Sequence, residues 1–161
     1  MRSAAMICEA SDADFLALSE GRAPEGLQLP EGSFEDPAVL SMLRELASTI
    51  RPAFSPASWK IVERGELVGL CSLVKTPVDG SIEIGYGVTQ SRRGRGHASE
   101  AVQALVAWAR QDPRVAVCKA ETSVHNEPSQ RVLQNSGFVR TGTRTDHEDG
   151  ELICWSLLVA E

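Results

Sequence analysis

The stretch VTQSRRGRGHASEAV, residues 88–102, decides how this chain is interpreted. It places three arginines and two glycines between Arg92 and Gly96, with a strand-like run before them and a helix-like run after. A helix that begins at such a turn presents unpaired backbone N–H groups at the positive end of its dipole, and these groups bind anions. The turn therefore predicts a phosphate site at a helix start. A solvated basic turn, or one that contacts nucleic acid, is the alternative.

The same turn lacks two better-known phosphate motifs. It has neither the Gly-Lys-Ser/Thr sequence with which P-loops hold nucleoside triphosphates and Mg²⁺ nor a complete G-x-G-x-x-G. We therefore expect a phosphate ligand without metal chemistry. The four cysteines are far apart in sequence, which excludes paired C-x-x-C zinc ligands. We interpret them as buried free thiols in strands: Cys8, Cys71, Cys118 and Cys154.

Composition limits the class of protein. The 161 residues fit one domain, 1–161, and 42% hydrophobic with 24% charged residues is an ordinary globular mixture with a real core. A net charge of −6 and only 5% aromatic residues argue against a general nucleic-acid binder. No apolar run approaches the ~18 residues that span a bilayer, and residues 1–15 make a poor secretory signal. We expect a cytoplasmic protein without a membrane partner.

On both sides of 88–102, hydrophobic periodicity and turn residues predict a mixed α/β fold. The predicted order of elements is β-α-α-β-β-β-α-β-α-β-β. One helix begins at Asp36 and Pro37, and its apolar positions fall on one face (Val39, Met42, Leu43, Leu46 and Ile50). The strand, helix and strand at 82–89, 96–110 and 115–124 must form a parallel crossover. The remaining predicted elements are strand 4–10, helix 11–20, the hairpin 58–76, a helix from Pro128 to Gly137, and strands 138–144 and 151–159.

The strand before the turn has two different faces. Ile82, Ile84, Tyr86 and Val88 point one way, and Glu83, Gly85 and Gly87 point the other, because side chains alternate along a strand. Two glycines in a strand indicate either a bend or the close approach of another group to the backbone.

Two motifs in sequence carry a family resemblance. RRGRGHA contains R-x-x-G-x-A at Arg93, Gly96 and Ala98, and NEPSQRVLQNSGF follows from Asn126 to Phe138. The pair resembles the GCN5-related N-acetyltransferases (GNAT family), in wording closest to the branch of ribosomal-protein N-terminal acetyltransferases. The resemblance covers about 60–159. It implies a single GNAT-like domain with a splayed central pair of parallel strands, and an enzyme that uses acetyl-CoA as cosubstrate without a metal.

By that resemblance, the cofactor pyrophosphate would lie on the amides of residues 93–98. The pantetheine arm would run beside the strand that ends at Val88, and Asn126 and Ser129 would lie near the pantetheine and the sulfur. For Asn126 and Ser129, the alternatives are a helix cap and a solvated first-turn serine. The implied cofactor-binding set is Val88, Arg93, Gly94, Arg95, Gly96, His97, Ala98, Ser99, Asn126 and Ser129.

Acetyl transfer to an amine needs a base, because the amine must lose a proton before it attacks the thioester. Glu83 is the first candidate, since it shares a face with Gly85 and Gly87, and Glu121 on the neighbouring strand is the alternative. A simple ion pair between Glu83 and a surface cation explains the same position. Many members of the family carry a tyrosine four residues before the glycine of the GF pair. Here Leu133 stands at that position, so Ser129 or water is left as the proton donor.

The acceptor should bind where the chain is least like the family, in 20–55 and in the turn 143–150. Both segments are acidic, so the sequence favours a cationic amine on a small molecule or peptide, although solvated loop charge explains the same pattern. Two alternatives stay open: a catalytically silent CoA sensor or interaction module, and a nucleic-acid binder that uses SRRGRGH. The sequence also leaves a homodimer open.

Overall fold

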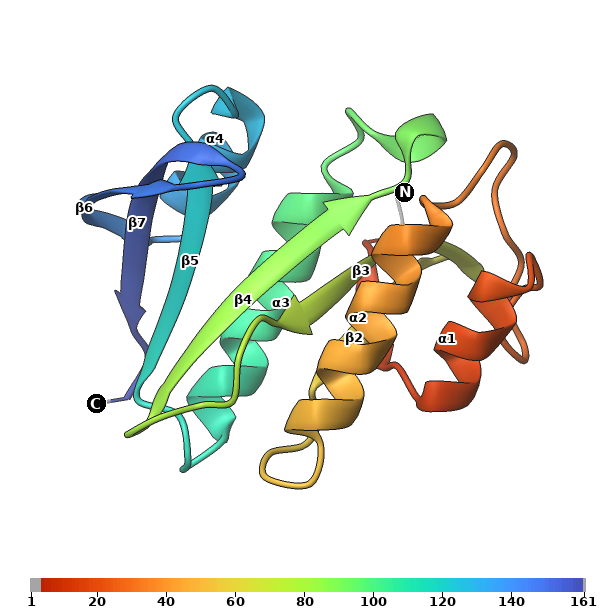
Figure 1. Cartoon of the computed structure of the whole chain (residues 1–161), viewed down its shortest axis with the longest axis horizontal. Coiled ribbons are helices and arrows are strands. Elements are labelled where there is room, and N and C mark those ends of the chain that lie inside the picture. The colour runs from red at the N-terminus through yellow and green to blue at the C-terminus, as the bar shows by residue number, and fades with distance from the viewer. Residues whose placement is uncertain (1–3, 161) are drawn as a thin grey trace.

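The computed structural model describes residues 4–160 and contains one open seven-stranded sheet, in the strand order β1-β2-β3-β4-β5-β7-β6 (Figure 1). All neighbouring strands are antiparallel except β4 and β5, which are parallel. The order of elements is the one predicted from the sequence, with a 3₁₀ turn η1 added before α3. The elements are β1 (Met6–Glu9), α1 (Asp12–Ser19), α2 (Pro37–Ile50), β2 (Ser58–Glu63), β3 (Glu66–Leu73), β4 (Ser81–Val88), η1 (Gln90–Arg92), α3 (His97–Gln111), β5 (Val117–Ser123), α4 (Glu127–Asn135), β6 (Val139–Asp146) and β7 (Gly150–Leu158).

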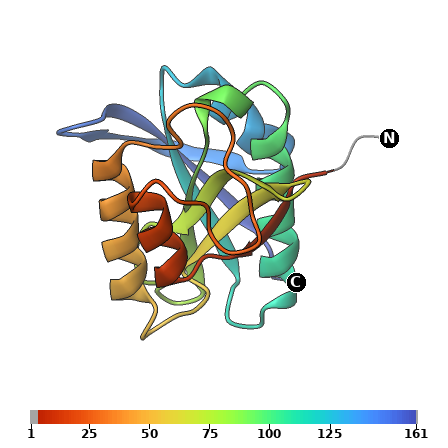
Figure 2. The ribbon, with the colours of Figure 1, turned by 90° about the vertical axis from the view of Figure 1, so that its right-hand side faces the viewer.

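The helices form layers on the two faces of the sheet. Figure 2 shows α1 and α2 on one side and α3 on the other, with the sheet between them. Strand β3 lies under helices on both faces, which is why every residue from Leu67 to Leu73 is buried. On β4 the alternation is the predicted one: Ile82 and Ile84 are buried, 1% and 3% exposed.

Local sequence signals explain where the helices begin and end. Ser11 and Asp14 form a capping box at the start of α1. The Asp36 carboxylate accepts a hydrogen bond from the Ala38 amide, and Pro37 is the first residue of α2. After α4, Gly137 has a φ of 94°, and the Phe138 amide donates to the Leu133 carbonyl, as in a glycine-terminated helix.

The parallel pair β4 and β5 is short and then separates. Their pairing extends from Ser81 opposite Val117 to Ile84 opposite Ala120, whereas β4 continues to Val88 and β5 to Ser123. Figure 1 shows the two strands diverging beyond this point. The splayed central pair implied by the family resemblance is therefore confirmed.

The sequence expectations about burial were wrong for Met42 and Cys8, and Cys154, which was also expected to be buried, is only partly so. Met42 was placed on the buried face of α2 but is 52% exposed, because that helix turns Leu40, Ala47 and Ile50 inward. Cys8 was expected to be buried, yet it is exposed, since β1 is an edge strand of the sheet. All four cysteines are free thiols in strands. From residue 4 to residue 160, no helix combines the length and apolarity that crossing a bilayer requires.

Candidate active site

The turn between β4 and α3 has the geometry of an anion site. Gly94 and Gly96 adopt left-handed φ angles of 78° and 81°, which residues with a side chain rarely adopt. The first hydrogen bond of α3 runs from the Glu100 amide to the Gly96 carbonyl. The N–H groups of residues 97–99 thus precede the hydrogen-bond ladder of the helix and lie at its positive end.

A cavity of about 690 Å³ extends from this turn along the end of β4 to the start of α4. Nine of the ten predicted cofactor-binding residues line it, and Arg95 is the exception. Tyr86 and Gly87 line it as well, and they were not in the predicted set. The nine are Val88, Arg93, Gly94, Gly96, His97, Ala98, Ser99, Asn126 and Ser129.

The arginines of the turn differ in what they contact. Arg92 donates hydrogen bonds of 2.6–2.9 Å to the carboxylates of Glu31 and Glu66, so it ties the loop before α2 to β3. The guanidinium hydrogen bonds hold the pKa of Glu31 at about 2. Arg93 Nε donates to the Val88 carbonyl at 2.9 Å. Arg92 is thus neutralised by carboxylates, and backbone amides remain the main donors of this turn.

One edge of β4 is left without a strand partner at the cavity. From Gly85 to Val88, β4 pairs with β3 on one side, but β5 has already separated on the other. An extended chain can add to such an edge by backbone hydrogen bonds, as in strand addition. The edge faces the cavity through Tyr86, Gly87 and Val88.

Sequence reasoning missed the partnership of Tyr86 with Ser129. The Tyr86 hydroxyl lies 2.8 Å from Ser129 Oγ, although the two residues are 43 positions apart. Burial raises the pKa of Tyr86 to about 12, so it carries its proton at neutral pH. The alternation of β4 was the available signal, because it placed Tyr86 on the α3 face, where α4 packs against α3.

Asn126 and His97 line the same cavity but differ in their hydrogen bonding: Asn126 has a partner, whereas both ring nitrogens of His97 are buried without one. Asn126 is the N-cap of α4, and its side chain accepts a hydrogen bond from the Ser129 amide at 3.2 Å. The helix-cap alternative is therefore present in the structure. His97 opens α3, is 4% exposed, and its Nδ1 lies 3.5 Å from Glu100 Oε1.

The two predicted bases have different surroundings. Glu83 lies near the start of β4 with its carboxylate 3.7 Å from Lys75 Nζ, in a small cavity that Lys119 also lines. Glu121 receives hydrogen bonds from the Arg144 guanidinium, at 2.6 Å from Nη2, and these lower its pKa. Glu121 is thus a weak base, whereas no such bidentate arginine engages Glu83.

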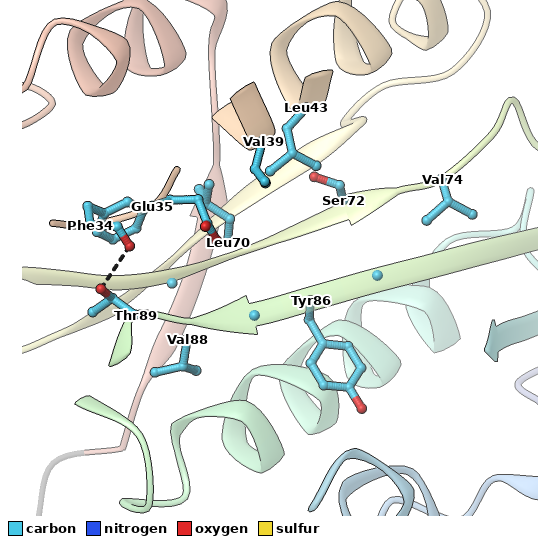
Figure 3. A pocket seen from close by; sticks show the side chains of 13 residues that line it. Phe34, Glu35, Val39, Leu43, Leu70, Ser72, Val74, Tyr86, Val88 and Thr89 are labelled. Carbon is cyan, nitrogen blue, oxygen red and sulfur yellow. Dashed lines mark hydrogen bonds between the residues drawn. The ribbon is translucent and has the colours of Figure 1, made fainter. Parts of the chain in front are cut away.

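A second cavity, of about 190 Å³, lies on the other face of β4, under α2 (Figure 3). Three of the acidic residues in the segments 20–55 and 143–150, which were expected to attract a cationic amine, have partners of their own. Glu20 pairs with Arg22, Glu31 pairs with Arg92, and Asp146 accepts from backbone amides of its own turn. Glu35 is the acidic residue of 20–55 that lines this second cavity.

Comparison with known proteins gives a consistent result. A family model described as an acetyltransferase (GNAT) domain matches residues 9–139. The chain is 33% identical over 101 residues to the uncharacterized N-acetyltransferase YjdG of Bacillus subtilis (strain 168), covering 61% of this chain and 57% of that protein. The chain spans about half the length of the curated relatives it matches.

Solved structures share the fold at low sequence identity. The ribosomal L7/L12 alpha-N-protein acetyltransferase RimL, in complex with coenzyme A, has a TM-score of 0.73 at 16% identity and covers 95% of this chain and 93% of its own. The aminoglycoside acetyltransferase AAC(6')-Ib, in complex with coenzyme A, has a TM-score of 0.69 at 19% identity, with coverages of 96% and 95%. Both of these structures contain bound coenzyme A.

Proposed function

This chain belongs to the acetyltransferase (GNAT) domain family, and from that premise we propose that it is an acetyl-CoA-dependent N-acetyltransferase acting on a primary amine. The amine would attack the thioester directly while both substrates are bound. The observation that carries the proposal is the 690 Å³ cavity, which joins a phosphate-type helix start to the unpaired edge of β4. That arrangement offers amides to the pyrophosphate and a strand edge to the pantetheine.

Glu83 is our proposed base. It stands on β4 one position before Ile84, the last residue that pairs with β5, and so close to the point where the strands separate. It would accept the amine proton directly or through one water. Glu121 is the second choice, because the hydrogen bonds from Arg144 stabilise its charged form and make it less basic.

Ser129 and Tyr86 are our proposed donor pair for the leaving sulfur. As the N–C bond forms and the C–S bond breaks, the thiolate would take a proton from Ser129 Oγ, Ser129 would take one from the Tyr86 hydroxyl at 2.8 Å, and Tyr86 would regain its proton from water. The pair would replace the tyrosine that many family members carry where this chain has Leu133. Leu133 is fully buried and has no proton to give.

The proposal also covers the binding partner of the protein and its cellular compartment. The partner would be an amine acceptor, either a small molecule or a peptide, and not a nucleic acid or a membrane. Free thiols at all four cysteines support a reducing compartment such as the cytoplasm.

Thermal unfolding and coenzyme A release test the proposal together. Acetyl-CoA at about 100 times its dissociation constant stabilises a protein by about 2.7 kcal/mol and should raise the melting temperature, less so at high salt. An amine panel should then release coenzyme A and yield acetylated product by mass spectrometry. An unchanged melting curve at millimolar acetyl-CoA would refute cofactor binding. A raised melting temperature without transfer to any amine would instead favour the silent sensor.

A further inference from the structure

The second cavity, under α2, shares three residues with the cofactor cavity. Tyr86, Gly87 and Val88 line both cavities, which lie on opposite faces of β4. In Figure 3, Val39 and Leu43 of α2 lie above β3 and β4, while the Tyr86 ring points to the opposite side. A group held in this cavity is therefore separated from the proposed thioester path only by the end of β4.

The walls of this cavity are apolar, and their polar groups already have partners. Ser72 Oγ lies 2.9 Å from Ser58 Oγ, and Thr89 Oγ1 donates to the Phe34 carbonyl at 2.8 Å. Water gains little in a cavity that offers it few hydrogen bonds, so such a space favours an apolar occupant. The apolar side chains that line it are Phe34, Val39, Leu43, Leu70 and Val74.

Two glycines keep the floor of the cavity open. A Cβ built on Gly87 would meet no atom within 4 Å, so its absence leaves space rather than relieving a clash. A Cβ on Gly85 would lie 3.2 Å from Val74 Cγ1. Both glycines line the cavity under α2, so the close-approach interpretation applies to the face of β4 that is turned toward α2.

The size of the cavity limits what it can hold. An apolar cavity of about 150 Å³ is enough to bind benzene. The 190 Å³ under α2 thus fits one aromatic ring or a branched aliphatic group, and nothing the size of an aminoglycoside.

The charge near the cavity also indicates which kind of acceptor the cavity can hold. Glu35 is the only carboxylate among the described residues that line it, and its exposed position suits one ammonium group at the entrance. A second positive charge on the acceptor would therefore have no carboxylate partner among the described residues that line this cavity.

Building on the acetyl transfer proposed above, we propose that the cavity under α2 holds the apolar substituent of the acceptor. The acceptor is then a primary monoamine that carries, within a few bonds of its nitrogen, a group the size of one aromatic ring or a leucine side chain. Two sources share this chemistry: a free arylalkyl or branched alkyl amine, and a peptide N-terminus with an apolar first residue.

The test compares acceptors that differ only in the group destined for the cavity. We would measure kcat/KM for 2-phenylethylamine and isoamylamine against ethylamine, ethanolamine and spermidine. Burying one ring or branched chain should favour the apolar amines about 10- to 100-fold. Peptides beginning with Leu or Phe, compared with Ser or Gly, form the second arm. Preference for apolar groups in either arm supports the proposal, and the arm that reacts identifies the source.

Substitutions in α2 test whether the preference for apolar amines depends on this cavity. Val39→Phe fills the space and should reduce the ratio of phenylethylamine to ethylamine to about one, with KM for acetyl-CoA unchanged. Leu43→Ala enlarges the space and should shift the optimum toward larger rings. Met42→Phe is the matched control, because it adds the same ring to an exposed position of the same helix and should leave the ratio alone.

The outcomes separate this proposal from the one it depends on. If amines are acetylated but ethanolamine or spermidine reacts as well as phenylethylamine, the apolar-acceptor inference fails and the acetyltransferase proposal stands. An unchanged ratio in both Val39→Phe and Leu43→Ala also overturns it. If no amine is acetylated, both proposals fall.

Discussion

Removing the Tyr86 hydroxyl tests whether this group donates a proton during catalysis or only forms a structural hydrogen bond. Tyr86→Phe deletes the 2.8 Å contact with Ser129 Oγ and the weaker one, at 3.3 Å, with the Ser129 carbonyl. The net worth of such a bond is about 0.5–1.5 kcal/mol, and water from the open cavity can replace it. For a domain of this size, about 1 kcal/mol lowers the melting temperature by roughly 2–4 °C.

The expected loss of turnover is larger than that structural cost. Positioned acid–base groups contribute about 10²- to 10⁴-fold, equivalent to roughly 3–5 kcal/mol in the activation barrier. If Tyr86 and Ser129 act as one donor pair, Tyr86→Phe should lower kcat by about 10² or more. The acetyl-CoA shift in melting temperature should be retained, because the hydroxyl is not part of the phosphate-binding turn.

The assay is steady-state release of coenzyme A by Tyr86→Phe, Ser129→Ala and the double variant, with melting curves of each. Residues that act as a unit show non-additive losses, so the double variant should be no slower than the worse single variant. A kcat for Tyr86→Phe within about twofold of wild type, with only the small drop in melting temperature, would refute the reasoning. The thiolate would then leave unassisted, since a free thiol has a pKa near 8.5.

Gly96→Val should abolish measurable acetyl-CoA binding by calorimetry, because it places a branched residue at a φ of 81° and a side chain where the pyrophosphate approaches. Gly65→Val, at a φ of 76° in the β2–β3 turn, carries matched strain and should bind normally; normal binding by Gly96→Val would move the phosphate site elsewhere. Glu83→Gln should lower kcat about 10²-fold with unchanged acetyl-CoA affinity and partial rescue at high pH. Wild-type turnover in that variant, with the same pH profile, would shift attention to Glu121 and solvent. Glu31→Gln should lower the melting temperature at pH 7, because the pKa of Glu31 falls from 4.5 to about 2 on folding. A lowered folded pKa gives stability that is complete above pH 4.5 and lost as pH falls toward 2, so wild type and Glu31→Gln should converge in acid. A difference in melting temperature that stays constant with pH would contradict the Arg92–Glu31 contact.

The sequence by itself determined the elements, their order and the turn of the proposed cofactor site. Ser11, Asp36 and Gly137 act within three or four positions of the helix ends that they define, so their effect can be deduced without a fold. The strand, turn and helix around Gly94 and Gly96 are equally local. Because β4 and β5 are joined by a helix, their parallel pairing followed from the connection alone.

Only the tertiary structure decided which side chains work together at the site. Arg92 is held by Glu31, 61 positions away, so a charge that looked available for phosphate is already compensated. Tyr86 meets Ser129 because α4, which follows β5, packs beside α3 on the same side of the sheet as the Tyr86 ring. The cavity under α2 exists because a gap remains between that helix and the end of β4, where Leu43 and Gly87 are among the lining residues. Such contacts join segments that are far apart in sequence, and local propensity carries no information about the packing that creates them.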